Sequence, residues 1–191
     1  HGASSLAQTG IGRYACAMRI IRDYTYVNDA DRGASVAIGN FDGVHTGHQA
    51  VIEIARKAGQ AIGAPLGVMT FEPHPRQYFA PNAPAFRLMS REAKAHRLEK
   101  LGVQQLYELN FNTALSGLTP EDFARNVIVD GLGLKHVVVG ADFCFGRGRK
   151  GTAQDLQRFG DQMGFGVTIA ELIEAWAAAA RGRDDPREED A

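Results

Sequence analysis

The chain has 191 residues and a mass of 20.7 kDa, which fits one globular domain. Hydrophobic residues make up 45% of it and charged residues 23%, so there is enough apolar material for a core and wholesale disorder is excluded. The 21 Lys and Arg residues nearly balance the 22 Asp and Glu residues, and the resulting net charge of −1 argues against a general nucleic-acid-binding protein.

The cysteine pattern and the absence of long apolar runs give a first expectation of the compartment. Cys16 and Cys144 are far apart and form no CxxC pair, so neither a disulfide framework nor a cysteine zinc site is expected. The longest apolar candidate, 172–180, is far shorter than the ~20 residues of a membrane span and contains Glu174. The N-terminus lacks the basic start and apolar stretch of a signal peptide. We therefore expect a cytoplasmic protein with no membrane partner.

The two ends of the chain differ from its middle. The sequence begins with His, and Met18 is the first methionine, so residues 1–17 are expected to be a non-native or disordered extension. Residues 174–191 start with EAWAAAA, which favours a helix, and from residue 182 onward are polar and expected to be disordered. The folded domain is expected over 18–173.

Between these ends, short apolar runs alternate with amphipathic stretches. The runs expected as strands are 34–39, 65–71, 103–111, 135–140 and 166–172. Helices are expected from near Thr46, after Ser90, after Thr119 and after Thr152, the last three residues being of the type that caps a helix N-terminus. This alternation predicts an α/β fold of the Rossmann-like kind: an open, mostly parallel five-stranded sheet with helices on both faces.

Unusual residues cluster after the expected strands, where open parallel sheets bind ligands. The loops after the first, second and fourth runs read GNFDGVHTGH (39–48), FEPHPR (71–76) and GADFCFGRGRKG (140–151), and a shorter Asn-Phe-Asn follows the third. One crevice lined by these loops is the economical interpretation.

The strongest local signal is the pair His45 and His48 at a helix start. A helix N-terminus offers free N–H groups and partial positive charge, which suits a phosphate, and two imidazoles three residues apart share a face. Gly47 between them would let a ligand approach the backbone. Two alternatives stay open: a pair of surface histidines, or a zinc site completed by His74 or Asp142. We assign no metal to protein side chains.

The second loop is stiffened by Pro73 and Pro75, and it could present Phe71, His74, Tyr78 and Phe79 to a planar ring. A purely structural turn is the alternative.

The fourth loop contains a literal G-x-G-x-x-G at 146–151. It lies late in the chain and six residues beyond its strand, so the context of a dinucleotide fingerprint is missing. Arg147, Arg149 and Lys150 are instead expected to form a basic flap over phosphates, or else a solvated run of charge. No P-loop motif occurs in the chain.

Four ordered motifs carry a family resemblance: GNFDGVHTGHQ, TFEPHPRQYF, FRLMSREAKAHRLEKLGV and VVVGADFCFGRGRKGT. Over about Met18 to Ile173 the chain resembles the N-terminal module of bacterial FAD synthetases, the bifunctional riboflavin kinase/FMN adenylyltransferases. The resemblance implies a nucleotidylyltransferase fold that transfers AMP from Mg²⁺-ATP to FMN, giving FAD and pyrophosphate. The substrates implied are therefore FMN and ATP, with Mg²⁺ arriving with ATP.

The resemblance also implies roles for particular residues. His45, His48 and Asn40 would be catalytic. The residues implied to surround ATP are Gly39, Asn40, Phe41, Asp42, His45, Gly47 and His48, with Arg147 and Arg149 of the flap. Those implied to contact FMN are Phe71, Pro73, His74, Pro75, Phe79, Asp142 and Phe143. Because an FMN phosphate oxygen attacks the α-phosphorus directly, positioning and charge neutralisation suffice and no protein nucleophile is required.

The chain departs from the family pattern in one segment. The family carries Ser-Ser/Thr-x-x-Arg after the fifth strand, whereas nothing after Thr168 here is Ser or Thr, and no motif supports Arg181 or Arg183 as a substitute. We expect no riboflavin kinase activity and slow or absent FAD formation. Two alternatives remain: a weak flavin- or nucleotide-binding fragment, and a related enzyme for another phosphate such as phosphopantetheine or nicotinamide mononucleotide.

Overall fold

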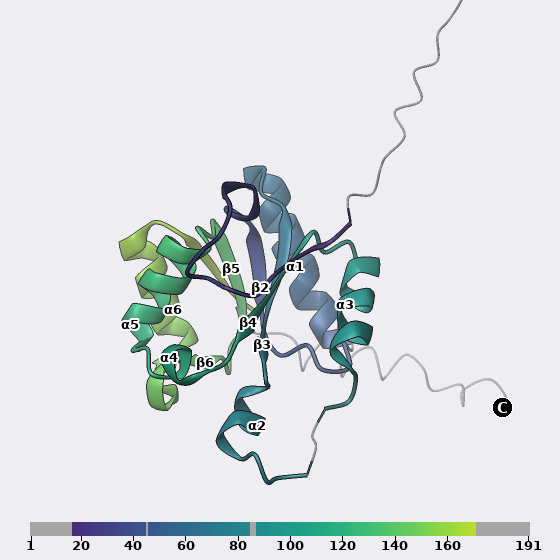
Figure 1. Ribbon diagram of the computed structural model, residues 1–191. Coiled ribbons are helices and arrows are strands. Elements are labelled where there is room, and N and C mark those ends of the chain that lie inside the picture. The colour runs from purple at the N-terminus through teal and green to yellow at the C-terminus, as the bar shows by residue number, and fades with distance from the viewer. Residues whose placement is uncertain (1–16, 45, 85–86, 171–191) are drawn as a thin grey trace, which may run out of the picture.

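The fold is built on one open sheet of six parallel strands (Figure 1). The computed structural model describes residues 17–44, 46–84 and 87–170. Across the sheet the strands are β1 (Arg19–Ile21), β4 (Gln105–Asn110), β3 (Leu66–Glu72), β2 (Ser35–Ile38), β5 (His136–Gly140) and β8 (Gly166–Ala170). The five predicted strands and the α/β class are confirmed, but the predicted strand number is wrong because β1 adds a sixth.

The helices follow the expected order, with additions. They are α1 (Thr46–Ile62), α2 (Pro75–Phe79), α3 (Arg91–Lys100), α4 (Thr113–Ser116), α5 (Pro120–Asp122), the π-helical η2 (Phe123–Gly131), and α6 (Ala153–Met163). The described residues also contain the short 3₁₀ turns η1 (Asp29–Asp31) and η3 (Arg147–Arg149). A two-stranded antiparallel ribbon is formed by β6 (Cys144–Phe145) and β7 (Gly151–Thr152). The helix predicted after Thr119 is present, but only its first turn is α-helical before it widens into η2.

The predicted capping residues act as caps. The hydroxyl oxygens of Ser90, Thr119 and Thr152 each accept a hydrogen bond from a backbone N–H three residues later. At α6 the Asp155 carboxylate in turn accepts a hydrogen bond from the Thr152 N–H, forming a capping box that satisfies two otherwise open donors.

The core has one layer on each face of the sheet. On one face α1 and α3 pack through Val51, Ile52, Ala55 and Leu98. On the other face η2 and α6 pack through Phe123, Val127, Leu156 and Phe159. Figure 1 shows these two helical layers on opposite sides of the strands. This arrangement buries both faces of a parallel sheet, as the near-continuous apolar strands require.

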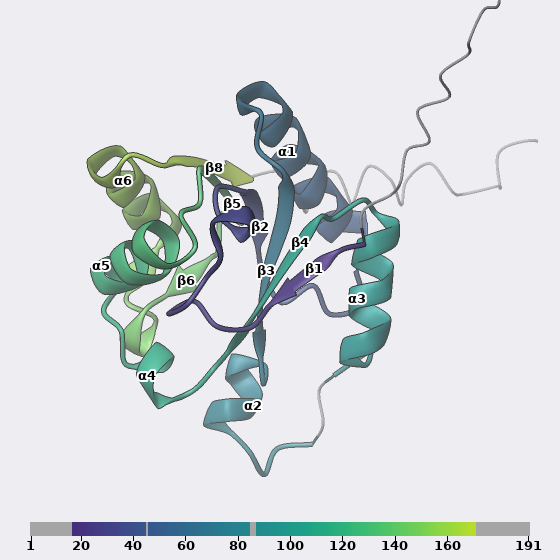
Figure 2. The same cartoon turned by 45° about the horizontal axis from the view of Figure 1, so that its top comes forward.

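Strand β1 lies at the sheet edge beside β4, as Figure 2 shows. The segment after it is tied down by Tyr107, whose hydroxyl donates to the Asp31 carbonyl at 2.6 Å, and by an ion pair between Arg19 and Asp31. With three residues, β1 is too short to show a strand period in the sequence.

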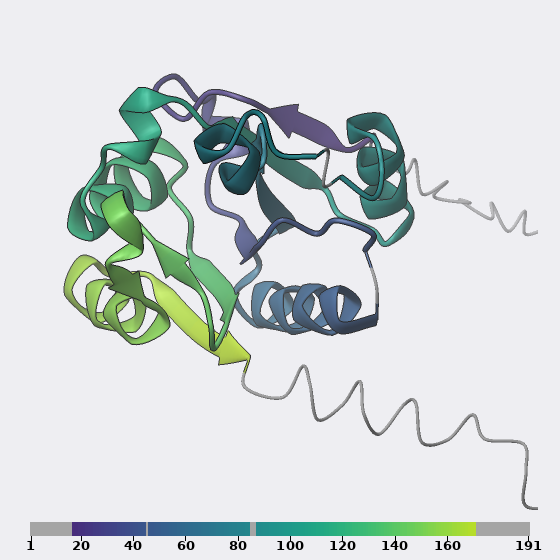
Figure 3. The same ribbon diagram turned by 90° about the horizontal axis from the view of Figure 1, so that it is seen from below.

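The loops that follow the parallel strands lie together at the carboxyl edge of the sheet. Figure 3 views this edge, where α2 follows β3 and the connection to α3 returns over the strand ends. Among the described residues, no helix has the length and apolar character to cross a bilayer.

Candidate active site at the carboxyl edge of the sheet

The turn after β2, residues 39–44, is held in an uncommon backbone conformation. Phe41 and Val44 have φ of 49° and 40°, and Gly43 has φ of 80°. A Cβ at Gly39 would meet the Phe41 ring at 3.2 Å, so the ring covers this glycine closely. Left-handed non-glycine residues cost free energy and persist where surrounding contacts determine them. The turn is therefore a specified structure and not a passive connection.

Helix α1 starts directly after this turn. Gly47 is buried in the first helical turn, and the His48 ring packs on Phe41 with ring centroids 5.1 Å apart. His45 lies outside the described residues. The structure thus places His48 and the turn at one helix N-terminus, where backbone N–H groups and the helix dipole favour an anion.

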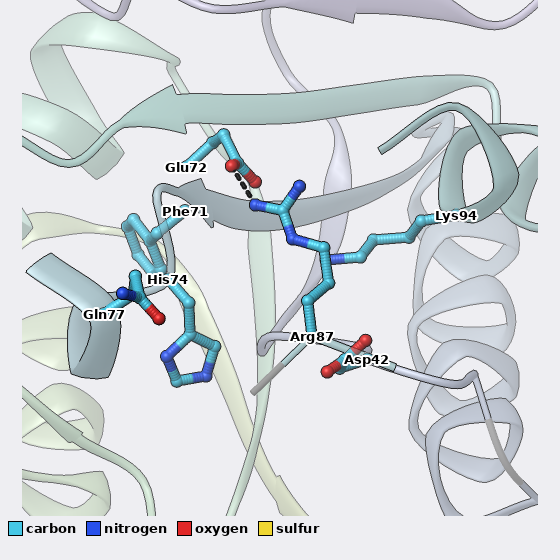
Figure 4. A pocket seen from close by; sticks show the side chains of 7 residues that line it. All are labelled: Asp42, Phe71, Glu72, His74, Gln77, Arg87 and Lys94. Carbon is cyan, nitrogen blue, oxygen red and sulfur yellow. Dashed lines mark hydrogen bonds and ion pairs between the residues drawn. The ribbon is translucent and has the colours of Figure 1, made fainter. Parts of the chain in front are cut away.

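A cavity of about 290 Å³ lies beside the turn (Figure 4). Its lining residues are Asp42, Phe71, Glu72, His74, Gln77, Arg87 and Lys94. Three of these, Asp42, Phe71 and His74, come from the predicted site. Phe71 forms an apolar wall at the end of β3, and the other six side chains are polar.

Two contacts tie the polar groups of the cavity to the connection between α2 and α3. The Asp42 carboxylate accepts hydrogen bonds from the backbone N–H groups of Leu88 at 2.9 Å and Met89 at 3.3 Å. Arg87 forms an ion pair with Glu72, drawn as the dashed line in Figure 4. Both contacts fasten the connection between α2 and α3 to the strand ends.

Burial changes the proton affinity of two groups in the cavity. Desolvation lowers the pKa of Lys94, while the charge of Asp42 acts in the opposite direction. The pKa of His74 is also lowered, first by desolvation and then by the positive charge of Lys94. The Nδ1 atom of His74 accepts from the Arg76 N–H at 3.0 Å, which fits a neutral imidazole that caps α2.

An aromatic group extends from the cavity over the end of β3, α2 and the residue after β4. Phe111 makes edge-to-face contacts with Phe71, Tyr78 and Phe79, at centroid distances of 5.9, 5.2 and 5.8 Å. Phe79 remains 68% exposed. Pro73 follows a cis peptide bond, and Pro75 occupies the first turn of α2. The aromatic side chains of the second loop therefore gather around Phe111, and Phe79 is the exposed member of the group.

The loop after β5 lies apart from the cavity. Phe143 stacks on Phe145 of β6 with ring planes 13° apart, while Asp142, Arg147 and Arg149 are exposed. The Arg147 N–H donates to the Leu118 carbonyl at 2.7 Å, which anchors this loop next to α5. None of these four predicted residues lines the 290 Å³ cavity.

Sequence reasoning missed Glu72, Gln77, Arg87 and Lys94 as lining residues. A signal existed for Lys94 alone: it precedes buried Leu98 by four residues and so shares the inward face of α3. Arg87 and Glu72 meet only through the return of the chain, which no local pattern reports. Within the part of the chain that the structure describes, no three His, Cys, Asp or Glu side chains are grouped as a metal site.

Comparisons with known proteins identify the family of the chain. The family model described as FAD synthetase matches residues 27–178. The chain is 40% identical over 158 residues to a bifunctional riboflavin kinase/FMN adenylyltransferase of Pseudomonas fluorescens, covering 82% of this chain and 50% of the relative. It is 36% identical over 157 residues to the Escherichia coli K12 protein of the same description, with the same two coverages.

A solved structure gives the same fold. A protein from Streptococcus pneumoniae, described as a macrolide-efflux protein, aligns with a TM-score of 0.66 and 28% identity, covering 80% of this chain and 50% of that one. The chain spans about half the length of the curated relatives it matches. Because the family match covers most of the domain, the chain belongs to the FAD synthetase family.

Proposed function

We propose that this domain is an FMN adenylyltransferase, which joins AMP from ATP to the phosphate of FMN. The observation that carries the proposal is that a helix N-terminus suited to phosphate lies at the same sheet edge as a cavity lined by Phe71 and His74. His48 and the 39–44 turn form the first part, and Phe71 with His74 forms the second. Family membership supports the same chemistry.

In the proposed reaction an FMN phosphate oxygen attacks the α-phosphorus of ATP, and the bond to the bridging oxygen of pyrophosphate breaks. The N-terminus of α1 and His48 would hold ATP phosphate oxygens, with Asn40 and Gly39 shaping the turn. His45 keeps the same proposed role from its place in the motif. The phosphates of ATP would bring the divalent cation, which we propose is Mg²⁺, so no protein ligand set is needed for it.

The flavin ring would lie against the aromatic group. Phe71 and Phe79 offer apolar faces, and Pro73 and Pro75 keep the loop that carries His74 stiff. Asp142 and Phe143 would close the site from β5, while Arg147 and Arg149 would approach the pyrophosphate. These roles, and a location in the cytoplasm, are predictions from the residues and the family resemblance.

The test is incubation of the purified chain with FMN, ATP and Mg²⁺, followed by chromatography for FAD. Phosphopantetheine and nicotinamide mononucleotide serve as competing acceptors. Adenylylation of either acceptor in preference to FMN would refute the assignment.

A binding module without turnover is the second candidate, and the lack of Ser or Thr after Thr168 favours it. Binding of both FMN and ATP with no FAD formed would establish that candidate.

A further inference from the structure

Lys94 is buried on the same face of α3 as the core residue Leu98. Its residue is 9% exposed, while Glu92, Ala93, His96 and Arg97 on the same helix are exposed. A lysine at a helix surface can extend into water at little cost, and fully buried lysines are rare unless they are paired. Its inward position therefore needs a partner that offsets the loss of hydration.

That partner is a backbone carbonyl of the turn after β2. The Lys94 Nζ donates to the Asn40 oxygen at 2.9 Å. Beyond the β2–β3 pairing, the Gly39 N–H still donates a hydrogen bond to the Met69 carbonyl of β3. Asn40 is the next residue and lies just past the hydrogen-bonded part of the sheet. The bond is partly buried, so its loss would remove a charge-assisted hydrogen bond from the first residue after the β2 ladder.

The segment just before α3 contacts the turn at a second point. The Asp42 carboxylate holds the Leu88 and Met89 N–H groups, a few residues before α3 begins. Phe41, between these two contacts, has a left-handed backbone and is 1% exposed. Asn40, Phe41 and Asp42 are thus clamped from the 88–94 side, and this clamp offsets the strain of the turn.

We propose that Lys94 is a positioning residue for the nucleotide: it holds the Asn40 carbonyl and thereby keeps the 39–44 turn shaped to present the start of α1 to ATP. The inference rests on the proposed function for its last step, the link to ATP. Its first step, that Lys94 holds the turn, is a property of the fold alone. Figure 4 shows the Lys94 side chain extending into the cavity.

The experiment compares Lys94→Met, which removes charge and donor, with Lys94→Arg, which keeps both. Lys100→Met, an exposed lysine on the same helix, is the matched control. Backbone hydrogen exchange over 39–48 reports the turn, and exchange over β3 and β4 reports the sheet. Dissociation constants for Mg²⁺-ATP and FMN are measured on the same proteins.

In Lys94→Met we expect exchange in the turn to rise about tenfold, with β3 and β4 unchanged, as expected for local opening after loss of a charged donor. The ATP dissociation constant should rise about tenfold and that of FMN less than about threefold. Lys94→Arg and Lys100→Met should resemble the unaltered chain. If Lys94→Met does not fold, Lys94→Gln replaces it with the same expected directions.

Three results would overturn the proposal. Unchanged exchange in the turn would show that Lys94 does not hold it. A uniform rise across the sheet would assign Lys94 to global stability, and a loss confined to FMN affinity would mean that it contacts the flavin nucleotide directly. If the unaltered chain binds neither nucleotide, the proposed function fails, and the exchange data still decide whether Lys94 holds the turn.

Discussion

Replacing His48 by Ala tests the assignment of the α1 start to ATP. The imidazole packs on Phe41 at 5.1 Å between centroids, so its loss should remove ~0.5–1.5 kcal/mol of aromatic contact. For a domain of this size that lowers the Tm by only a few degrees, at ~2–4 °C per kcal/mol. A lost hydrogen bond to a charged phosphate costs ~1.5–3 kcal/mol, which corresponds to ~10–150-fold weaker ATP binding.

The assay is calorimetric titration with Mg²⁺-ATP beside fluorescence titration of FMN, with Tm measured on the same samples. His96→Ala, an exposed histidine on α3, is the control and should change neither affinity. FMN affinity should be retained in His48→Ala, and any FAD formation should fall ~10²–10³-fold. The reasoning is refuted if His48→Ala binds ATP as tightly as the unaltered chain, or if FMN affinity falls instead.

Three further outcomes are expected. Introducing Ser-Ser-Thr-x-x-Arg after residue 173 should raise FAD formation by ~10³-fold, because two or three charge-assisted contacts of ~1.5–3 kcal/mol each would be regained. The rate of FAD formation is measured by chromatography. Equal rates with and without the introduced segment would show that it is unimportant. Thr152→Ala removes the hydroxyl of the α6 capping box and should lower the free energy of unfolding by ~0.5–2 kcal/mol in urea titrations, whereas Thr25→Ala in an exposed loop should cost less. Burial lowers the pKa of His136, so the unfolded chain binds this proton more readily, and the free energy of unfolding should fall as the pH drops through the ordinary histidine range. His136→Gln should reduce the dependence of the free energy of unfolding on pH between pH ~7 and ~5. An unchanged dependence would contradict the assignment of this effect to His136.

Much of the local structure follows from the sequence. The apolar runs and the capping residues Ser90, Thr119 and Thr152 predicted the strands and helix starts that the structure shows. These features depend on neighbours within a few residues, which is why composition and spacing report them. The turn at 39–44 and the stiff loop at 71–75 were also visible as patterns, because glycine permits backbone conformations that other residues avoid and proline fixes φ.

The sheet edge and the cavity depended on the tertiary structure. Strand β1 is too short to carry a pattern and exists through pairing with β4, far along the chain. Lys94 reaches Asn40, Asp42 holds Leu88, and Arg87 pairs with Glu72 across gaps of 54, 46 and 15 residues. No local propensity encodes such contacts, since each exists only after the chain returns over the strand ends. The sequence by itself therefore determined the element order and the chemistry of the loops, while the long-range contacts of Arg87 and Lys94 with the end of β3 and the turn after β2 decided which charges line the cavity.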